Sequence, residues 1–423
     1  MTIRVSASQI SGHIRMHGSK SLSQRYILLS AFSGTPLVMT NRSWSEDEEV
    51  AIRIAKGCGS VVSVKDDAVT VDPNFHCPDV LDVGQSATSL RLVLGLLAAK
   101  KCRTEISMAP SLATRPHEDL LESLKDFGGN FSWIDPGKLN ADLSGLSVLP
   151  YSISGSSSSQ FVSSLIMMNA LGSGKAEVRT SYGVASAGYI DLTIQALQAF
   201  GYTVVRQENL FRIEDMGRPD QVTVRLEGDY SSAAFLLTLG ALTSENGIVI
   251  DNLPVDSRQP DAVYPAILKK AHAAVRQSER AVIIGKERVG KVTLDVDANP
   301  DLAPPISVLG MFNKEGVVLR NCKILEIKES NRLSAIGDLA QAFGTVAERI
   351  GNDLIMRPSA GKVTSFPEFS DHRMVMALVI ASIISGVSLP IRNEGATIKS
   401  YGNFLDDLKR LGVSIVVEED KEL

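Results

Sequence analysis

The chain has 423 residues, of which 44% are apolar and 22% charged, and its formal net charge is −5. These fractions are close to those of ordinary globular proteins and exclude the disordered and fibrous classes. Because one hydrophobic core stops growing at roughly 250 to 300 residues, we expect two domains. The negative balance gives no support for a nucleic acid or an anionic membrane as partner, so cations that bind anionic ligands must be gathered locally.

The four cysteines, Cys58, Cys77, Cys102 and Cys322, form no C-x-x-C pair. This spacing argues against a metal knuckle, a redox motif or a disulfide framework and favours a reducing cytoplasm. The first residues, MTIRVSASQISG, do not resemble a secretory signal. The longest apolar run, residues 375–385, is shorter than the roughly 18 residues needed to cross a bilayer and predicts a buried helix. We therefore expect a cytoplasmic protein.

An amphipathic helix that ends at a glycine and is followed by an alternating strand recurs along the chain. The unit is roughly 70 residues long and occurs six times. The expected stop positions are Gly59, Gly128, Gly201, His272, Gly344 and Gly412. Glycine suits a helix end because the left-handed conformation there is costly for other residues. His272 departs from this rule, so either that unit ends differently or its alignment is wrong.

Polar clusters rich in small residues precede four apolar helical stretches. They lie at residues 18–25 (GSKSLSQR), 84–91 (GQSATSLR), 154–160 (SGSSSSQ) and 228–232 (GDYSS). Taken singly, each is explained by serine or aspartate as an N-cap. Together they suggest helix N-termini that converge on a polyanionic ligand, because free backbone N–H groups and the helix dipole favour anions.

A second kind of cluster combines bases with acids. Lys328 and Arg332 share a face at the start of a predicted helix, and Glu329 is either the local salt-bridge partner of Arg332 or a functional acid. Asp371 fits an N-cap before the apolar helix. Arg373 fits either a surface ion pair or a polar cleft, and Arg115 and Lys399 carry no signal alone.

Ten motifs in order make the chain resemble the 5-enolpyruvylshikimate-3-phosphate synthase family. They are GSKSLSQR, GQSATSLR, TRPHEDLLESL, SSSQFVSSLIM, SAGYIDLTI, EGDYSSAAFLL, PDLAPPISVLG, IKESNRL, SDHRMVMAL and IKSYGNFLDDL. The resemblance implies an α/β fold with mixed sheets and two domains, each of three βαβαββ repeats around buried helices. The domains would span residues 19–227, and 1–18 with 228–423. The first would mainly bind shikimate 3-phosphate, and the site would lie in the cleft between them.

The family transfers the enolpyruvyl group of phosphoenolpyruvate to the 5-hydroxyl of shikimate 3-phosphate and releases phosphate through a tetrahedral intermediate. The reaction belongs to the shikimate pathway to chorismate and aromatic amino acids. The resemblance implies a monomer that uses no metal or cofactor and has these two anions as its partners, with no nucleic acid and no membrane.

The resemblance also assigns the ligand-binding residues. The positions that match shikimate 3-phosphate binding are Lys20, Ser21, Arg25, Ser158, Ser159, Gln160, Ser186, Tyr189, Asp301 and Lys328. Those that match phosphoenolpyruvate binding are Lys20, Ala87, Arg115, Gln160, Arg332, Arg373 and Lys399. Guanidinium groups suit carboxylate and phosphate oxygens because they can donate two parallel hydrogen bonds.

Three catalytic residues are implied. Asp301 matches the general base for the attacking hydroxyl, although as a residue before a helix it also fits a cap. Glu329 matches the group that exchanges a proton with the methylene carbon, and Lys20 is an alternative donor to that carbon.

Several positions depart from the family pattern. Gln85 and Ala87 stand where Asn and Gly are usual, Ala187 and Gly188 replace Lys-Pro, and Ile324 replaces an Asn that contacts phosphate. The methyl of Ala87 is expected to weaken inhibition by glyphosate.

Two alternative functions remain. One is a UDP-N-acetylglucosamine enolpyruvyl transferase. Such enzymes commonly have a cysteine in the loop where this chain has residues 111–114 (SLAT), and they have a Lys-Asn pair where this chain has Lys20 and Ser21. A sugar-phosphate binding protein without catalysis is disfavoured by Asp301, Glu329 and Lys20 together.

Overall fold

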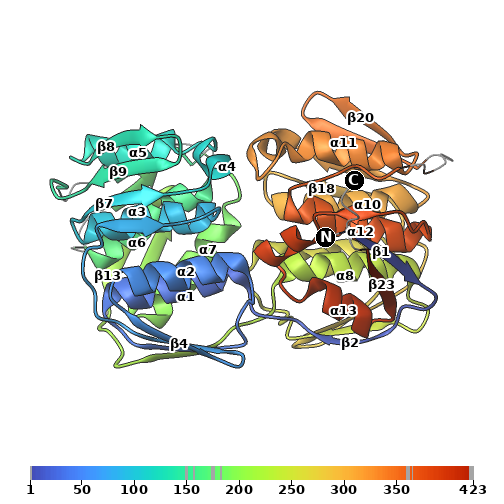
Figure 1. Ribbon diagram of the computed structural model, residues 1–423, viewed down its shortest axis with the longest axis horizontal. Coiled ribbons are helices and arrows are strands. Elements are labelled where there is room, and N and C mark those ends of the chain that lie inside the picture. Colours follow the sequence, from blue (N-terminus) through green and yellow to red (C-terminus); the bar gives the residue numbers. More distant parts are fainter. Residues whose placement is uncertain are drawn as a thin grey trace. The chain divides into compact units, whose positions relative to one another are not determined.

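The computed structural model describes residues 2–147, 151–155, 158–172, 177–181, 183–358, 363 and 365–418. The chain divides into two compact units. We call Gly18–Leu226 the central unit, and Met1–His17 together with Glu227–Leu423 the terminal unit. Figure 1 shows both units as layers of helices and small sheets.

Three apolar helices pack against one another inside each unit. In the central unit these are α1 (Lys20–Ser33), α3 (Ala87–Ala99) and α6 (Ser159–Leu171). In the terminal unit they are α8 (Tyr230–Thr243), α10 (Ala303–Phe312) and α12 (His372–Ser385). They are buried on nearly every face, because their sequences are apolar all round. The predicted buried helix at residues 375–385 is thus part of α12.

Outer helices carry one apolar stripe each and end where the sequence predicts. They are α2 (Glu46–Gly57), α5 (Glu118–Asp126), α7 (Gly188–Ala199), α9 (Tyr264–Lys270), α11 (Arg332–Ala342) and α13 (Phe404–Arg410). All six predicted stop residues have positive φ, including His272 at +66°. The unit at His272 was therefore aligned correctly, and histidine adopts there the conformation that glycine adopts elsewhere.

Small sheets cover the helices. Those of the central unit have the strand orders β14-β3-β5-β4, β6-β7-β9-β8 and β10-β11-β13-β12. Their bounds are β3 (Leu37–Thr40), β4 (Val61–Lys65), β5 (Ala68–Asp72), β6 (Val80–Asp82), β7 (Arg103–Ser107), β8 (Asn130–Asp135), β9 (Lys138–Asp142), β10 (Tyr151–Ile153), β11 (Glu177–Thr180), β12 (Tyr202–Gln207), β13 (Leu210–Asp215) and β14 (Val222–Arg225).

The terminal unit has two sheets of the same kind and a smaller third one. Their strand orders are β16-β17-β15-β2, β18-β19-β21-β20 and β22-β1-β23. The bounds are β1 (Thr2–Ala7), β2 (Gly12–Arg15), β15 (Ile248–Asp251), β16 (Ala274–Gln277), β17 (Ala281–Gly285), β18 (Val292–Asp295), β19 (Val317–Arg320), β20 (Val346–Ile350), β21 (Asp353–Arg357), β22 (Ile391–Arg392) and β23 (Val413–Glu418).

Each four-stranded sheet joins one parallel pair to an antiparallel hairpin, as β6 and β7 with β9 and β8. The remaining short helices are α4 (Pro110–Ala113) and the 3-10 helices η1 (Pro260–Val263), η2 (Pro300–Leu302), η3 (Cys322–Ile327) and η4 (Glu394–Lys399). The predicted fold class, mixed α and β with two domains of three repeats, is confirmed.

Two glycines fix the places where the chain enters an inner helix. A Cβ on Gly18 would lie 2.0 Å from the Asn41 carbonyl oxygen, and one on Gly228 would lie 2.5 Å from that of Asn252. Asn41 and Asn252, both with positive φ, donate side-chain hydrogen bonds to the carbonyls of Leu226 and Met16. Both units therefore begin their first inner helix, α1 or α8, with the same close backbone packing.

Among the described residues, no helix combines the length and the apolar character that a bilayer crossing requires.

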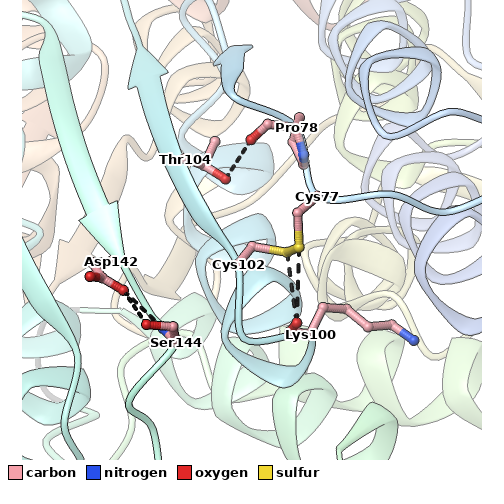
Figure 2. The surroundings of a disulfide bond; sticks show 7 residues. All are labelled: Cys77, Pro78, Lys100, Cys102, Thr104, Asp142 and Ser144. Carbon is pink, nitrogen blue, oxygen red and sulfur yellow. Dashed lines mark hydrogen bonds between the residues drawn. A yellow bond between two sulfur atoms is a disulfide. The ribbon is translucent and has the colours of Figure 1, made fainter.

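The structure contradicts one prediction from the cysteines. Cys77 and Cys102 form a disulfide bond, which Figure 2 shows beside Thr104 and Pro78. Val80 of β6 lies opposite Glu105 of β7 in this parallel pair of strands. Cys77 lies three residues before Val80 and Cys102 lies three residues before Glu105, so the strand pairing brings the two cysteines together. The expectation of no disulfide was wrong because this proximity comes from strand pairing, which the cysteine spacing does not reveal.

Reduction of this bond should destabilise the central unit alone. A cross-link over a loop of this length is worth about 3 kcal/mol in the chain-entropy account. Trp44 and Trp133 are the only tryptophans of the chain, and both belong to the central unit. Urea unfolding followed by tryptophan fluorescence should therefore shift to lower urea concentration when dithiothreitol is present.

The double variant C77S/C102S is the matched control, since it should unfold at the reduced midpoint with or without dithiothreitol. Burial raises the pKa of the Cys58 thiol to about 12 and that of the Cys322 thiol to about 11, so neither should react with a thiol reagent in the native state. An unchanged wild-type midpoint on reduction would contradict the prediction.

Candidate functional site

The N-terminal ends of the inner helices in the central unit are joined by side chains. Ser86 is the N-cap of α3 and accepts a hydrogen bond from the Ser89 N–H. The Ser86 and Ser89 hydroxyls donate to the Gln24 side-chain oxygen of α1, at 3.0 and 2.9 Å. The polar residues that sequence analysis placed at helix starts thus link α1 to α3.

Arg91 connects α3 to α6. Its guanidinium donates to the Gln160 side-chain oxygen at 2.8 Å and to the Pro116 carbonyl at 2.9 Å. Gln160 in turn donates to the Thr88 hydroxyl at 2.8 Å, and Ser158 is the N-cap of α6. Ser159, the first residue of α6, is buried. The structure therefore gathers three predicted residues, Ser158, Ser159 and Gln160, around an arginine that sequence analysis did not assign.

Arg25 is a buried cation with uncharged partners. Its Nε donates to the Thr193 hydroxyl at 2.8 Å, and its terminal nitrogens donate to the carbonyls of Ser21 and Tyr189. Burial lowers its pKa to about 10, an effect that Tyr189 partly opposes. Within the described parts of the chain, no carboxylate forms an ion pair with Arg25. A buried guanidinium of this kind favours an added anion.

Ser186 lies next to this arginine site. It has a φ of +56°, which is rare for serine, and its carbonyl accepts from the Tyr189 N–H. The turn leads directly into α7. Ser21, Arg25, Ser186 and Tyr189 are therefore brought together by α1 and α7.

Lys20, the first residue of α1, pairs with a carboxylate. Its Nζ lies 3.0 Å from an oxygen of Asp47 in the first turn of α2, and both side chains are largely buried. Sequence analysis did not select Asp47, which stands in an acidic run typical of a helix start.

In the terminal unit, five residues form what we call the carboxylate–arginine cluster: Asp301, Glu329, Arg332, Asp371 and Arg373. Arg332 is its centre, with a side chain that is 1% exposed. It donates to Asp301 at 2.8 Å, to Glu329 at 2.7 Å and to Asp371 at 2.8 Å. Burial disfavours its charge, but the carboxylates of Asp371, Glu329 and Asp301 outweigh burial and raise its pKa above the usual value.

Asp301 bridges the two arginines of this cluster. One of its oxygens accepts from Arg332, and the other accepts from Arg373 at 2.9 Å. Burial would raise the pKa of Asp301, but Arg373, Arg332 and Lys328 hold it well below its usual range. In this state Asp301 is a firmly ionised carboxylate.

The structure settles the local interpretations of these residues. Glu329 does form the predicted salt bridge to Arg332, and Asp371 is the N-cap of α12, where it accepts from the Arg373 N–H. Arg373 is buried, so it does not form a surface ion pair. Asp301 lies inside η2, whose N-cap is Asn299 instead.

Three predicted cations lie at the ends of short elements. Lys328 directly follows η3 and is close enough to lower the pKa of Asp301. Lys399 ends η4, and no hydrogen bond or ion pair joins it to the other predicted residues among those described. Arg115 lies in the turn after α4. Burial, the charge of Arg91 and the charge of Arg115 lower the pKa of His117 to about 4.

Two positions that depart from the family pattern are buried. Ala87 is the first residue of α3, and Ile324 lies in η3. Among the described residues, no group of three metal-ligating side chains is arranged to hold a metal ion.

Replacement of Asp301 tests the pH dependence of this cluster. Because the folded pKa of Asp301 lies below the unfolded value of about 3.9, its ionised form stabilises the fold above that pH. This stabilisation should be lost as the pH falls below about 4.

We expect D301N to unfold more easily than the wild type at pH 7, by about 2 kcal/mol. Thermal unfolding can be followed by circular dichroism at a series of pH values. The difference in unfolding free energy between the wild type and D301N should stay constant down to about pH 4 and then decrease. A gap that widens on acidification would contradict this pairing.

Arg91, Asp47 and the contact of Asp371 with Arg332 were not predicted from the sequence. Arg91 was visible as the residue one helical turn after Ala87 in the quoted motif. The pairing of Asp47 with Lys20 and that of Asp371 with Arg332 were not visible, since these residues meet only through the packing of separate helices.

Comparison with known proteins extends over nearly the whole chain. The family model of EPSP synthase (3-phosphoshikimate 1-carboxyvinyltransferase) matches residues 5–408. The 3-phosphoshikimate 1-carboxyvinyltransferase of Picrophilus torridus is 40% identical and covers 98% of this chain and 100% of its own length. That of Thermoplasma volcanium is 38% identical and covers 97% of this chain and 98% of its own length.

Solved structures share the fold at low sequence identity. EPSP synthase from Acinetobacter baumannii superposes with a TM-score of 0.80 at 20% identity, covering 99% of this chain and 100% of that chain. The enolpyruvyl transferase NikO from Streptomyces tendae has a TM-score of 0.78 at 18% identity and covers 98% of both chains.

Proposed function

The chain belongs to the EPSP synthase family, and we propose that it transfers the enolpyruvyl group of phosphoenolpyruvate to the 5-hydroxyl of shikimate 3-phosphate with release of phosphate. The observation that carries the proposal is the carboxylate–arginine cluster. It unites Arg332 and Arg373, which match phosphoenolpyruvate binding, with Asp301 and Glu329, which match acid–base catalysis.

The cluster is suited to exchange internal anions for substrate anions. In the ligand-free chain, the guanidinium groups of Arg332 and Arg373 are occupied by the Asp301 carboxylate. The carboxylate and phosphate of phosphoenolpyruvate would compete for the same donors. As each guanidinium turns to the substrate, the pKa of Asp301 would rise from its depressed value, and Asp301 would become a stronger base.

The proposed reaction has two steps. Glu329 must first leave its salt bridge to Arg332 and take up a proton from solvent. The 5-hydroxyl of shikimate 3-phosphate then adds to C2 of phosphoenolpyruvate, its proton passes to Asp301, and the C3 methylene gains the proton of Glu329. The C3 methyl of the tetrahedral intermediate then returns a proton to Glu329 as the C2–O bond to phosphate breaks, and Asp301 gives its proton to the departing phosphate. Lys20 is the alternative proton donor to C3, and its pairing with Asp47 keeps it charged.

The central unit supplies the proposed shikimate 3-phosphate residues. Arg25 is a buried cation without a carboxylate partner among the described residues, and Ser158 and Ser159 stand at the start of α6. A phosphate there would meet both a guanidinium and the N–H groups of a helix N-terminus. The family match adds the other members of the proposed binding set: Lys20, Ser21, Gln160, Ser186, Tyr189, Asp301 and Lys328.

The remaining phosphoenolpyruvate residues are proposed on the same family match: Arg115, Lys399, Gln160 and Ala87. A cytoplasmic location and a monomeric state are part of the proposal. They rest on family resemblance, and the disulfide removes the support that the cysteines had given to a reducing compartment.

Phosphate release from a mixture of phosphoenolpyruvate and shikimate 3-phosphate tests the function directly. We expect turnover by the wild type and a loss of at least about 100-fold in kcat for D301N, because a general base commonly contributes that factor. Binding of shikimate 3-phosphate, measured by calorimetry, should persist in D301N.

UDP-N-acetylglucosamine in place of shikimate 3-phosphate discriminates the main alternative. Turnover with the UDP sugar alone would replace the proposal with the sister reaction. Binding of both anions without any phosphate release would indicate a binding protein instead.

The methyl of Ala87 predicts weak inhibition by glyphosate, a bulkier ligand of the phosphoenolpyruvate site. A87G should lower the inhibitory concentration by about tenfold or more, since one methyl in a tight pocket is worth that factor. The inhibition constants of both proteins, measured in competition with phosphoenolpyruvate, check the prediction. Equal constants would show that Ala87 does not limit the pocket.

A further inference from the structure

Asp261, a residue outside the proposed machinery, lies beside the carboxylate–arginine cluster. It belongs to η1, and only 1% of it is exposed. An amide and a hydroxyl, both uncharged, donate to its carboxylate: Asn299 at 3.2 Å and Ser231 of α8 at 2.5 Å. A carboxylate so deeply buried is costly to ionise and requires an explanation.

Asn299 connects Asp261 to the proposed base. It is the N-cap of η2, and its carbonyl accepts from the Leu302 N–H, which closes the turn around Asp301. The Asp261 carboxylate therefore accepts a hydrogen bond from the side chain of Asn299, which begins this turn two positions before Asp301.

Two charges of the same cluster face Asp261. They are the negative charge of Asp301 in η2 and the positive charge of Arg373 in α12, while Ser231 and Asn299 supply the neutral contacts. Burial, and then repulsion from Asp301, raise the pKa of Asp261 to about 6, and Arg373 opposes this rise. The two carboxylates thus have pKa values displaced in opposite directions, a pattern typical of catalytic pairs.

We propose that Asp261 is a positioning residue for the transfer reaction, which acts through Asp301 by anchoring its turn and by keeping a second negative charge beside it. The inference rests on the proposed function. Three cations surround Asp301 and weaken it as a base. A neighbouring carboxylate counteracts them, because a like charge makes Asp301 hold a proton more strongly.

The charge of Asp261 gives the reaction a defined dependence on pH. As the pH falls through about 6, Asp261 takes up a proton and its charge is lost. The wild-type rate should then fall with it. The same ionisation costs stability, because the folded state binds the proton of Asp261 more tightly than the unfolded state does.

D261N separates these effects, since asparagine can accept from Asn299 and donate to Ser231 without a charge. We expect kcat at pH 7.5 to fall about tenfold or more with KM for both substrates nearly unchanged. The fall of the rate near pH 6 should be absent in D261N. Its melting temperature at pH 7.5 should equal or exceed that of the wild type, and this difference should vanish below about pH 4.

S231A is a second variant that tests the sign of the effect. The Ser231 hydroxyl stabilises the ionised form of Asp261, so its loss should move the acid limb of the rate to higher pH. D407N is the matched control. Asp407 is also buried in the terminal unit, with a pKa raised by burial, but it contacts Tyr401 and Arg410 instead of the cluster. It should leave the acid limb in place.

The outcomes are distinct. Wild-type turnover combined with an unchanged rate or an unchanged acid limb in D261N would overturn the role of Asp261 and leave the proposed function intact. A lower melting temperature of D261N at pH 7.5, with a rate loss equal to the loss of folded protein, would show a merely structural role and overturn it too. No wild-type turnover would overturn both proposals.

Discussion

The buried guanidinium of Arg332 is the interaction on which the terminal unit's chemistry depends. The side chain of Arg332 is only 1% exposed, and its buried charge is tolerated because three carboxylates contact it. They belong to Asp301, Glu329 and Asp371. These carboxylates come from segments far apart in the chain, so the arginine also fixes their mutual positions. The same arrangement keeps Asp301 ionised, because two arginines, Arg332 and Arg373, donate to its carboxylate.

The helix N-termini are capped differently in the two units. In the central unit, serines cap α3 and α6, and these helix starts keep their positive dipole ends without a capping charge. In the terminal unit, aspartates cap α8 and α12 and offset the dipoles of their own helices. Cations for ligands must there come from side chains such as Arg332 and Arg373. One backbone plan thus carries uncompensated helix N-termini in one unit and compensated ones in the other.

Features that repeat along the chain were predictable from the sequence, and features created by packing were not. The six helix stops follow from local conformation, so even His272 has the positive φ of its glycine counterparts. Residue types at the site were recognised through motif resemblance, whereas the pairing of Lys20 with Asp47 depends on how α1 meets α2. The Cys77–Cys102 bond escaped prediction for a related reason, since the register of β6 against β7 is a property of the sheet. Asp261 carried no signal because its neighbours come from three separate elements, α8, η2 and α12.

Strand β1 lies between β22 and β23, with Thr2 opposite both Arg392 and Glu418. The ribosome therefore delivers the first strand of this sheet long before its two neighbours exist. The central unit is complete once Leu226 has emerged, and it can fold while the rest is still being made. Strand β1 must wait with both of its edges unpaired until β22 has been synthesised, and its second edge stays unpaired until β23 follows. Loss of β23 would thus leave β1 paired with β22 alone, through Thr2 and Ile3.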